Sequence, residues 1–253
     1  MKTALTIAGS DPTGGAGLQA DLKVFRSFGV YGLSAVSAVT AQNTAGVDSV
    51  FPVERNAFEK QLRILISDIR PDAVKIGMLY STWSAEFLAE LFSEHGFRNI
   101  VIDPVAVSSS GMSLVDQGTL DLVRLKLFPL SRVITPNIYE AALLTGIMVE
   151  EQKGMEEAAR SLKSMGPEII VITGGHLEGK AADLFFDGVF HVIEAEKIEG
   201  DYHGTGCAFS SAITALLALN YTPLESVRKA KEYVRDAMKK GNFLGRGMTL
   251  LNL

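Results

Sequence analysis

Short apolar runs rich in β-branched residues alternate along the whole chain with longer segments of helical periodicity. Runs of four or five residues, such as 73–76 and 169–173, are too short for helices and indicate buried strands. Between such runs the apolar residues recur every three or four positions, as in residues 55–69, which Pro71 ends. This alternation predicts right-handed β-α-β units, and therefore a mostly parallel sheet covered by helices on both faces.

The pattern continues without a linker, an internal repeat or a low-complexity segment, so we expect a single domain over residues 1–253. Strands are expected at residues 3–8, 33–41, 73–76, 100–103, 132–135, 169–173, 183–186 and 189–193. Helices are expected at residues 17–28, 55–69, 84–94, 117–127, 138–144, 155–165, 206–219 and 224–240.

The parallel pattern breaks once, at Asp187-Gly188, which separates two of the apolar runs. Asp-Gly in this position favours a hairpin with a type I′ turn, in which both central residues take a positive φ. We therefore expect an α/β fold of three layers. Its central sheet is mostly parallel with an antiparallel edge hairpin, and helices cover both faces.

The charge of the chain excludes some partners. Lys and Arg number 24 against 29 Asp and Glu, which gives a net charge of −5, and no basic block is present. Nucleic-acid-binding proteins usually carry such a block, so we expect no nucleic-acid partner. Cys207 is the single cysteine, which excludes an internal disulfide and favours a reducing compartment. No apolar run reaches the roughly 18 residues of a membrane span, so we expect a cytoplasmic protein without a membrane partner.

Polar and glycine-rich segments follow several of the expected strands. Residues 9–17 follow the first strand, Gln42 and Asn43 the second, and Gly174-Gly175-His176 a later one. The long apolar helix near the end of the chain is entered through residues 203–207, with the sequence His-Gly-Thr-Gly-Cys. Ligands of parallel α/β sheets gather at the carboxyl ends of the strands, so these segments indicate a binding site at that edge.

Two familiar phosphate-binding motifs are not matched. Gly14 is followed by Gly15 and Ala16 rather than by the Lys and Ser or Thr of a Walker motif. Gly204-Thr205-Gly206 has Phe209 where the dinucleotide fingerprint has its third glycine, and no expected strand leads directly into it. Hydride transfer is therefore a weak interpretation.

Gly204, Thr205 and Gly206 can still form a different anion site, because they begin the apolar helix. Glycines let the backbone N–H groups converge, and the helix dipole adds partial positive charge. Donors fixed in this way suit a phosphoryl group in transfer. The alternative is that the two glycines only allow the helix to pack closely.

Several blocks of the sequence also occur, in the same order, in one known family. The blocks are Ala8-Gly9-Ser10-Asp11 with Gly14-Gly15-Ala16-Gly17 and Gln19-Ala20-Asp21, Thr40-Ala41-Gln42-Asn43-Thr44, Lys75-Ile76-Gly77-Met78, Asp103-Pro104-Val105, Thr135-Pro136-Asn137 with Glu140, Gly174-Gly175-His176, and His203-Gly204-Thr205-Gly206-Cys207. Over nearly its whole length the chain thus resembles the hydroxymethylpyrimidine and phosphomethylpyrimidine kinases of thiamin biosynthesis.

The resemblance implies a ribokinase-like fold and an ATP- and Mg²⁺-dependent phosphotransferase. The implied reaction phosphorylates 4-amino-5-hydroxymethyl-2-methylpyrimidine, and also its monophosphate to the diphosphate. The implied partners are this small-molecule alcohol and a second copy of the chain, in a homodimer.

On the acceptor side, the resemblance implies that the Gln42 amide reads the aminopyrimidine. An amide offers one donor and one acceptor, complementary to a ring nitrogen beside an amino group. The alternative is a polar residue that ends a strand. Met78 matches a residue that packs on the ring, a role that suits a flexible thioether, or else it is plain core. The implied pocket is completed by Gly9, Asp11, Gly15 and Val105, although Asp11 could instead only shape a turn with Pro12.

The implied catalytic group is Cys207, together with Gly204 and Gly206. At a helix N-terminus beside an anion site, we expect the pKa of the thiol to fall and the thiolate to be accessible. It could then take the proton of the substrate hydroxymethyl group as that oxygen attacks the γ-phosphate. The alternative is that Cys207 is a small buried apolar residue.

Metal and nucleotide positions are also implied by the resemblance. Asp103 and Glu140 match positions around magnesium, an ion that takes oxygen ligands and keeps several waters. The implied nucleotide-binding residues are Asn137, Thr173, Gly175, His176 and Thr205. Asn137 and Glu140 could also form a helix capping box, and both interpretations can hold together. Asp183 is similar to a position near the nucleotide.

The sequence departs from the family pattern at four places, which we interpret as lying mainly on the nucleotide side. Ala106 replaces a methionine, Thr173 replaces a lysine, Tyr202 replaces a threonine, and residues 245–249 replace the usual tail. Loss of the lysine could weaken nucleotide binding or shift its task to another cation. Two alternatives to the pyrimidine kinase stay open. One is a pyridoxal or pyridoxine kinase, and the other is an inactive pyrimidine-binding homologue.

Overall fold

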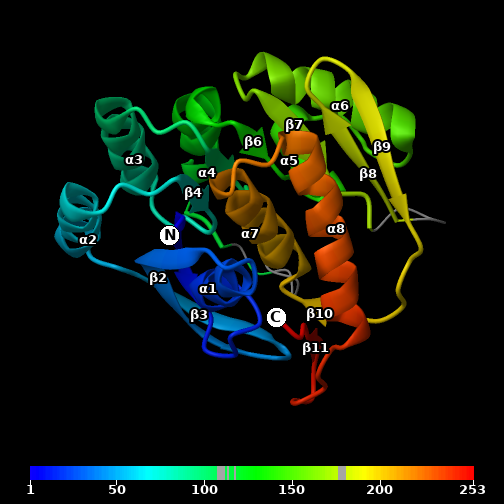
Figure 1. The fold of residues 1–253 in the computed structure, drawn as a ribbon, viewed down its shortest axis with the longest axis horizontal. Coiled ribbons are helices and arrows are strands. Elements are labelled where there is room, and N and C mark those ends of the chain that lie inside the picture. The colour runs from blue at the N-terminus through cyan, green and yellow to red at the C-terminus, as the bar shows by residue number, and fades with distance from the viewer. Residues whose placement is uncertain (107–111, 113, 117, 176–180) are drawn as a thin grey trace.

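The computed structural model describes residues 1–106, 112, 114–116, 118–175 and 181–253. The strands of its main sheet are β1 (Thr3–Ser10), β2 (Tyr31–Asn43), β3 (Gly46–Pro52), β4 (Ala73–Ile76), β5 (Ile100–Ile102), β6 (Val133–Ile134), β7 (Ile169–Ile172), β8 (Ala181–Phe186) and β9 (Phe190–Ala195). In the described chain their spatial order is β3-β2-β1-β4-β5-β6-β7-β8-β9 (Figure 1). The pairs from β2 across to β7 are parallel, whereas β3, β8 and β9 pair antiparallel.

Helices cover both faces of this sheet (Figure 1). They are α1 (Gly17–Ser27), α2 (Arg55–Asp68), α3 (Thr82–His95), α4 (Thr119–Leu122), α5 (Ile138–Thr145), α6 (Gln152–Ser164), α7 (Thr205–Ala218) and α8 (Pro223–Lys239), with a π turn η1 (Val123–Leu127) and a 3₁₀ turn η2 (Phe128–Leu130). One buried cluster joins the sheet to α2, α3, α5 and α6, and a second joins it to α1, α7 and α8. The expected three-layer, mostly parallel α/β fold is confirmed.

The buried strands explain why the two layers form. In β5, Ile100 and Ile102 belong to the first cluster, while Val101 between them belongs to the second. Successive side chains of a strand point to opposite faces, so a continuous apolar run needs an apolar cover on both sides. The carboxyl ends of these strands then face the loops that contain the polar segments.

The structure contains an edge strand that the sequence did not indicate. β3 pairs antiparallel with β2, with Thr40 opposite Val50. Every residue of β3 is at least partly exposed, so its sequence lacks the apolar run or strict alternation that indicates a strand. Antiparallel strands therefore lie at both edges of the sheet, rather than only at the expected hairpin.

The expected hairpin is present, but its turn is of another kind. Phe186 pairs with Phe190, which leaves three residues in the loop instead of two. Gly188 has a φ of 127°, whereas Asp187 does not take the positive φ that a type I′ turn requires. The Asp187 side chain instead accepts the Val189 N–H at 3.1 Å. This local hydrogen bond stabilises the longer loop.

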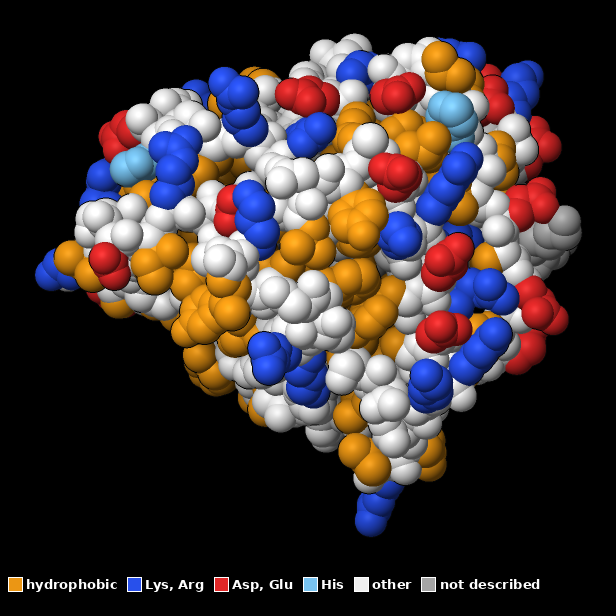
Figure 2. Space-filling model, viewed as in Figure 1, with side chains coloured by type: hydrophobic (Ala, Val, Ile, Leu, Met, Phe, Trp, Pro, Cys, Tyr) orange, Lys and Arg blue, Asp and Glu red, His pale blue; other side chains and the backbone are white. Residues whose placement is uncertain are grey.

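The surface seen in Figure 2 mixes acidic and basic side chains, most visibly over α8. This matches the interleaved charges of that helix, whose buried face packs on α7. None of the helices within the described ranges is both long and apolar enough to span a membrane.

Candidate active site

The turn before α7, which contains Gly204 and Gly206, is in direct contact with the loop after β1. A two-residue strand, β10 (Tyr202–His203), leads straight into the turn and pairs with β11 (Thr249–Leu250). The expectation that no strand precedes the turn was therefore wrong. Gly204 caps α7 with a φ of 85°. A β-carbon there would lie 1.8 Å from the carbonyl oxygen of Gly15, so only glycine fits this contact.

Asp11 both shapes its own loop and holds the strand before the glycine turn. Its carboxylate accepts the Thr13 N–H at 2.9 Å, the Thr13 hydroxyl at 2.8 Å and the Ala16 N–H at 2.9 Å. Its Oδ2 also lies 2.8 Å from Nε2 of the buried His203. Burial alone would raise the pKa of Asp11, but the hydrogen bonds from His203 and Thr13 outweigh burial and lower it. Asp11 is therefore ionised at neutral pH.

Gln42 also lies next to His203, as the motif positions predicted. Its side-chain nitrogen is placed 3.0 Å from Nε2 of His203, and its oxygen 3.1 Å from the Thr40 hydroxyl. His203 comes immediately before Gly204, so the amide is joined to the segment that begins α7. The prediction required this proximity, and the structure provides it.

A small apolar cluster packs against Val47, the β3 residue that pairs with Gln42. Met78, Ala38 and Leu114 form a small buried cluster, with Val105 packed against it. A β-carbon on Gly9 would come within 2.6 Å of the Met78 methyl group, so the glycine leaves the thioether its space. The structure therefore brings together Gly9, Met78 and Val105, three of the residues expected to line the acceptor pocket.

The expected lowering of the Cys207 pKa is wrong. Burial raises the pKa of the thiol to about 12, and the nearby carboxylates Asp103 and Asp21 act in the same direction. The Lys75 charge and the Gly17 N–H oppose this rise but do not overcome it. The helix N-terminus was expected to dominate, yet desolvation is the larger effect. The thiol is protonated at neutral pH in this arrangement.

A buried ion pair lies under the site and was not found from the sequence. Lys75 and Asp21 are both fully buried, with Nζ 2.7 Å from Oδ1. Ser211 and Thr6 donate to the same carboxylate at 2.6 and 2.5 Å. Burial opposes the charge of Lys75, but Asp21, Cys207 and Asp103 together raise its pKa, so the cation is permanent. The available signal was a lysine inside a four-residue apolar strand, although its partner could not be identified without the fold.

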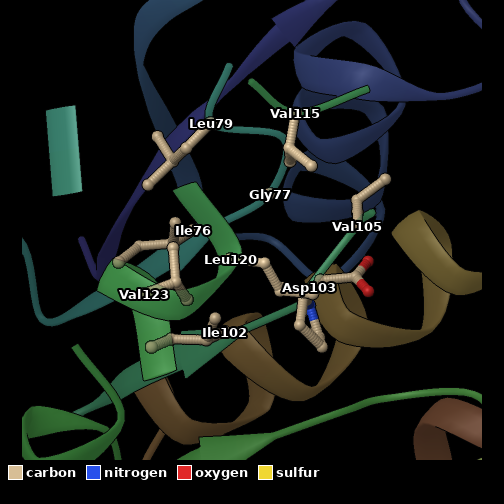
Figure 3. Close-up of a pocket in the computed structure, with 10 residues that line it drawn as sticks. Ile76, Gly77, Leu79, Ile102, Asp103, Val105, Val115, Leu120 and Val123 are labelled. Atoms are coloured by element: carbon tan, nitrogen blue, oxygen red, sulfur yellow. The ribbon is translucent and has the colours of Figure 1, made fainter. Parts of the chain in front are cut away.

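Asp103 lies at the end of β5, against the first turns of α7. Its Oδ2 accepts the Ser210 hydroxyl at 3.0 Å, and a β-carbon on Gly206 would lie 3.9 Å from the same oxygen. Burial raises the pKa of Asp103, while Lys75 and Ser210 oppose the rise. A small crevice of about 10 Å³, with room for about one water molecule, lies beside this residue. Figure 3 shows its apolar lining on one side and the Asp103 carboxylate turned away toward a neighbouring helix.

Glu140 forms the capping box that the sequence allowed. The Asn137 side chain accepts the N–H groups of Tyr139 and Glu140 at 2.9 Å each, and Glu140 accepts the Asn137 N–H at 2.9 Å. Burial raises the pKa of Glu140 to about 8, and the charge of Asp103 contributes, while the N–H groups of Asn137 and Ala106 lower it. The structure thus places Glu140 and Asp103 close enough to repel each other electrostatically.

These two carboxylates fit a magnesium ion in part. No group of three or more His, Cys, Asp or Glu side chains suited to a metal occurs in the described ranges. Magnesium keeps several waters and binds proteins through one or two carboxylates, so a pair is sufficient. A divalent cation would also offset the mutual repulsion of Asp103 and Glu140, which raises the pKa of the glutamate.

The expected nucleotide side lies around the end of β7. Thr173 bridges to Asn137, and its N–H donates to the Pro136 carbonyl at 3.0 Å. The Gly174 N–H donates to Asp183, which also pairs with the buried Lys231 at 2.7 Å. No atom of the described residues lies within 4 Å of the position of a β-carbon on the next residue of this turn, Gly175. Thr205 is the first residue of α7, and His176 lies outside the described residues.

Residues 245–249, which replace the usual family tail, lie on the acceptor side of the site rather than on the expected nucleotide side. The N–H of Gly247 donates to the Thr44 hydroxyl at 3.2 Å, and the N–H of Met248 donates to the Thr44 carbonyl at 2.8 Å. Thr44 is in the turn between β2 and β3, two residues after Gln42. Residues 245–249 therefore pack beside the strand of Gln42, and interpreting this departure as a nucleotide-side change was wrong.

A central sheet lies between two layers of helices, and the glycine-containing turn at residues 204–206 begins a helix at the carboxyl ends of the strands. This arrangement defines a kinase-like protein of the ribokinase class. The sequence profile of the family described as phosphomethylpyrimidine kinase matches residues 11–252, and the chain belongs to this family. Membership in a family of kinases implies ATP as the phosphoryl donor.

Three comparisons illustrate the relationship. The chain is 40% identical over 248 residues to a hydroxymethylpyrimidine/phosphomethylpyrimidine kinase of Bacillus subtilis, covering 96% of this chain and 92% of that protein. It is 42% identical over 246 residues to the bifunctional thiamine biosynthesis protein ThiED of Geobacter sulfurreducens, covering 96% of this chain but only 50% of that protein. The pyridoxal kinase of Staphylococcus aureus in complex with pyridoxal has a TM-score of 0.92 at 34% identity, covering all of this chain and 93% of its own.

Proposed function

We propose that the protein is an ATP-dependent kinase that phosphorylates 4-amino-5-hydroxymethyl-2-methylpyrimidine in thiamin biosynthesis, and also phosphorylates the monophosphate to the diphosphate. The observation that carries this proposal is the 3.0 Å contact between Gln42 and His203, which joins an amide to the turn that opens α7. Family membership supports the reaction class, since the related Bacillus subtilis protein is named for both substrates.

The acceptor binds through Gln42 and the apolar cluster that contains Met78. The amide reads the ring nitrogen and its neighbouring amino group, because it can donate and accept side by side. Met78 and Val105 pack on the ring, in space that Gly9 keeps open. The loop of Asp11 and Gly15 closes this side of the site.

The phosphoryl group binds at the start of α7. The N–H groups of Gly204, Thr205 and Gly206 lie at the start of α7 and have no backbone partner among the described residues. They are donors for the oxygens of the transferring group, and their positions are fixed before the reaction. The substrate hydroxyl oxygen attacks the γ-phosphorus, the bond to the ADP oxygen breaks, and the hydroxyl proton moves to Cys207 Sγ. Because the thiol is protonated in the present arrangement, it first has to release its own proton to solvent, and Lys75 is the charge that favours this loss.

Asp103 and Glu140 would hold the magnesium ion, which supplies positive charge against the phosphates of ATP. Asn137, Thr173, Gly175, His176 and Thr205 form the proposed nucleotide side. We further propose a single domain over residues 1–253 and a cytoplasmic location, as the sequence pattern indicates, and a homodimer, as the family resemblance implies.

Phosphorylation of pyridoxal is the second candidate function. It is favoured by the likeness to a kinase solved with pyridoxal bound. Both substrates are flat heteroaromatic alcohols, but the Gln42 amide favours an aminopyrimidine edge. A third possibility, a pyrimidine-binding homologue without turnover, is suggested by Thr173 and Tyr202.

One assay separates these functions. Purified protein is mixed with ATP, Mg²⁺ and either alcohol, and ADP release is measured. We expect faster turnover of the aminopyrimidine, and faster turnover of pyridoxal would overturn the proposal. If neither alcohol reacts but the pyrimidine raises the melting temperature, the protein only binds it.

Two variants test the assigned roles in the same assay. Gln42→Ala should raise KM for the pyrimidine while KM for ATP stays constant. Cys207→Ala should lower kcat at least a hundredfold with a modest change in KM, by analogy with the loss of a general base. A near-normal kcat for Cys207→Ala would reduce Cys207 to a packing residue.

A further inference from the structure

We propose that His203 is a positioning residue that sets the orientation of the Gln42 amide, and thereby decides which hydrogen-bonding edge of an acceptor ring the enzyme recognises. The proposal rests on the proposed function, because it concerns the reading of the pyrimidine. It assigns a task to a buried histidine that neither binds phosphate nor carries the reaction.

The geometry starts with one nitrogen that has two neighbours. His203 is buried, and its Nε2 lies 2.8 Å from Asp11 Oδ2 and 3.0 Å from the Gln42 amide. Asp11 already accepts three other hydrogen bonds, from Thr13 and Ala16, as an ionised carboxylate does. A carboxylate can only accept, so His203 Nε2 has to carry the hydrogen between them.

This hydrogen determines what Gln42 can present to the histidine. An amide NH₂ group cannot donate to a nitrogen that is itself an N–H donor. The amide atom near His203 is therefore the oxygen, and the amide is turned by 180° from the placement in which its nitrogen faces the ring. The two ends of an amide have nearly the same size, so hydrogen bonds are what distinguish them.

Thr40 gives the same orientation independently. Its hydroxyl has one hydrogen and two neighbours, the Ser10 carbonyl at 2.9 Å and the Gln42 amide at 3.1 Å. The carbonyl can only accept, so it takes the hydroxyl hydrogen. The Thr40 oxygen then accepts from Gln42, whose NH₂ group has to lie on that side.

Both contacts together leave a defined pattern for the ligand. Gln42 donates one N–H to Thr40, and one lone pair of its oxygen faces the single Nε2 hydrogen of His203, which is shared with Asp11 in a three-centre hydrogen bond. One N–H and one lone pair of the amide stay free. A 4-aminopyrimidine edge, with its ring nitrogen as acceptor and its amino group as donor, is complementary to this pair. A 4-oxo edge, with a ring N–H and a carbonyl, is complementary to Gln42 only when the amide takes the opposite orientation.

The experiment is a double-variant cycle on pyrimidine binding. His203→Leu removes the donor, whereas His203→Gln can retain an N–H near the Nε2 position. We expect His203→Leu to raise the calorimetric Kd and the KM for the aminopyrimidine roughly tenfold, the change expected for one hydrogen bond to a charged network. KM for ATP should not change, and His203→Gln should restore much of the pyrimidine affinity.

The Gln42→Ala background distinguishes positioning from a structural role. On that background His203→Leu should have almost no further effect on Kd, because the amide it orients is gone. His203→Leu should also lower the preference of the enzyme for the 4-amino over the 4-oxo alcohol, but only when Gln42 is present. Equal effects of His203→Leu in both backgrounds would overturn the proposal.

A direct readout does not need the variants to fold or the enzyme to turn over. In the ¹⁵N-labelled wild-type protein, the Gln42 side-chain NH₂ protons should show nuclear Overhauser contacts to the Thr40 side chain and not to the His203 Nε2 proton. The reverse contacts would refute the positioning role while leaving the proposed kinase reaction intact. Conversely, an enzyme inactive on the pyrimidine that shows the expected contacts would refute only the proposed function.

Discussion

The carbonyl oxygen of Gly15 occupies the place where a side chain on Gly204 would begin. A β-carbon built on Gly204 would lie 1.8 Å from that oxygen, far inside any real contact. Two turns that are almost 190 residues apart in the chain thus touch backbone to backbone. Their contact fixes the start of α7 relative to the loop of Asp11.

The contact predicts that Gly204→Ala is strongly destabilising. Alanine at a φ of 85° costs about 1–2 kcal/mol, and the steric overlap adds about 1–3 kcal/mol. Gly29→Ala is the matched control, since Gly29 has a φ of 72° but nothing within 4 Å. Urea unfolding should show a clearly larger loss for Gly204→Ala. Equal losses would mean that the contact with Gly15 is easily relieved.

Gly206→Ala should separate activity from stability. Among the described residues, a β-carbon there meets only Asp103 Oδ2, at an ordinary 3.9 Å, and alanine favours a helix by about 1 kcal/mol over glycine. We therefore expect an unchanged or higher melting temperature. Activity should fall at least tenfold, because the methyl group would enter the space of the phosphoryl oxygens. Full activity would indicate that the phosphate binds elsewhere.

Lys75→Met should leave the Asp21 carboxylate buried without its cation. Breaking a fully buried ion pair on one side costs about 3–5 kcal/mol. The double variant Lys75→Met, Asp21→Asn removes the stranded charge and should recover much of this loss. Chemical denaturation of the three proteins measures the difference, and a double variant no more stable than Lys75→Met would contradict this account.

The Cys207 thiol should be slow to alkylate in the folded protein. A pKa near 12 instead of the usual 9 leaves about a thousandfold less thiolate at pH 8. Iodoacetamide should therefore modify the native protein at least a hundredfold more slowly than the urea-unfolded protein. The chain has one cysteine, so a single mass shift reports the reaction. Similar rates would show that the thiolate is already present.

Asp11 should make stability depend on acidity in a defined window. Its pKa is lowered below the ordinary 3.8 in the folded protein, so its ionised form stabilises the fold above about pH 4. This contribution is lost as the pH falls through the lowered pKa. Asp11→Asn, which cannot ionise, should be less stable than the wild type at pH 7, and the gap should narrow below pH 4. A gap independent of pH would contradict the role of the charge.

Elements with a strong pattern could be predicted from the sequence, and weakly patterned ones could not. The strand at residues 73–76 was expected with the same bounds that β4 has, because a short apolar run buried on both faces has few other solutions. The exposed edge strand β3 lacks such a run, and its pairing depends on β2. The hairpin loop was expected to be shorter because Asp187 was assigned a positive φ that it does not adopt.

The motif positions located the site, but they did not determine its electrostatics. That Gln42 would lie near the segment before Cys207 followed from motif order along a parallel sheet, and His203 confirms it. The pKa of Cys207 depends on burial and on Asp103, Asp21 and Lys75, which come from separate parts of the chain. No local pattern contains such information, so the expected direction was wrong.

The packing of Gly247 and Met248 on Thr44 also affects how the protein is made. These residues are separated from Thr44 by about 200 positions. During synthesis on the ribosome, the turn after Gln42 has to wait for almost everything that follows before it can reach its final packing. The packing beside the strand of Gln42 is therefore completed only after residue 248 has been synthesised.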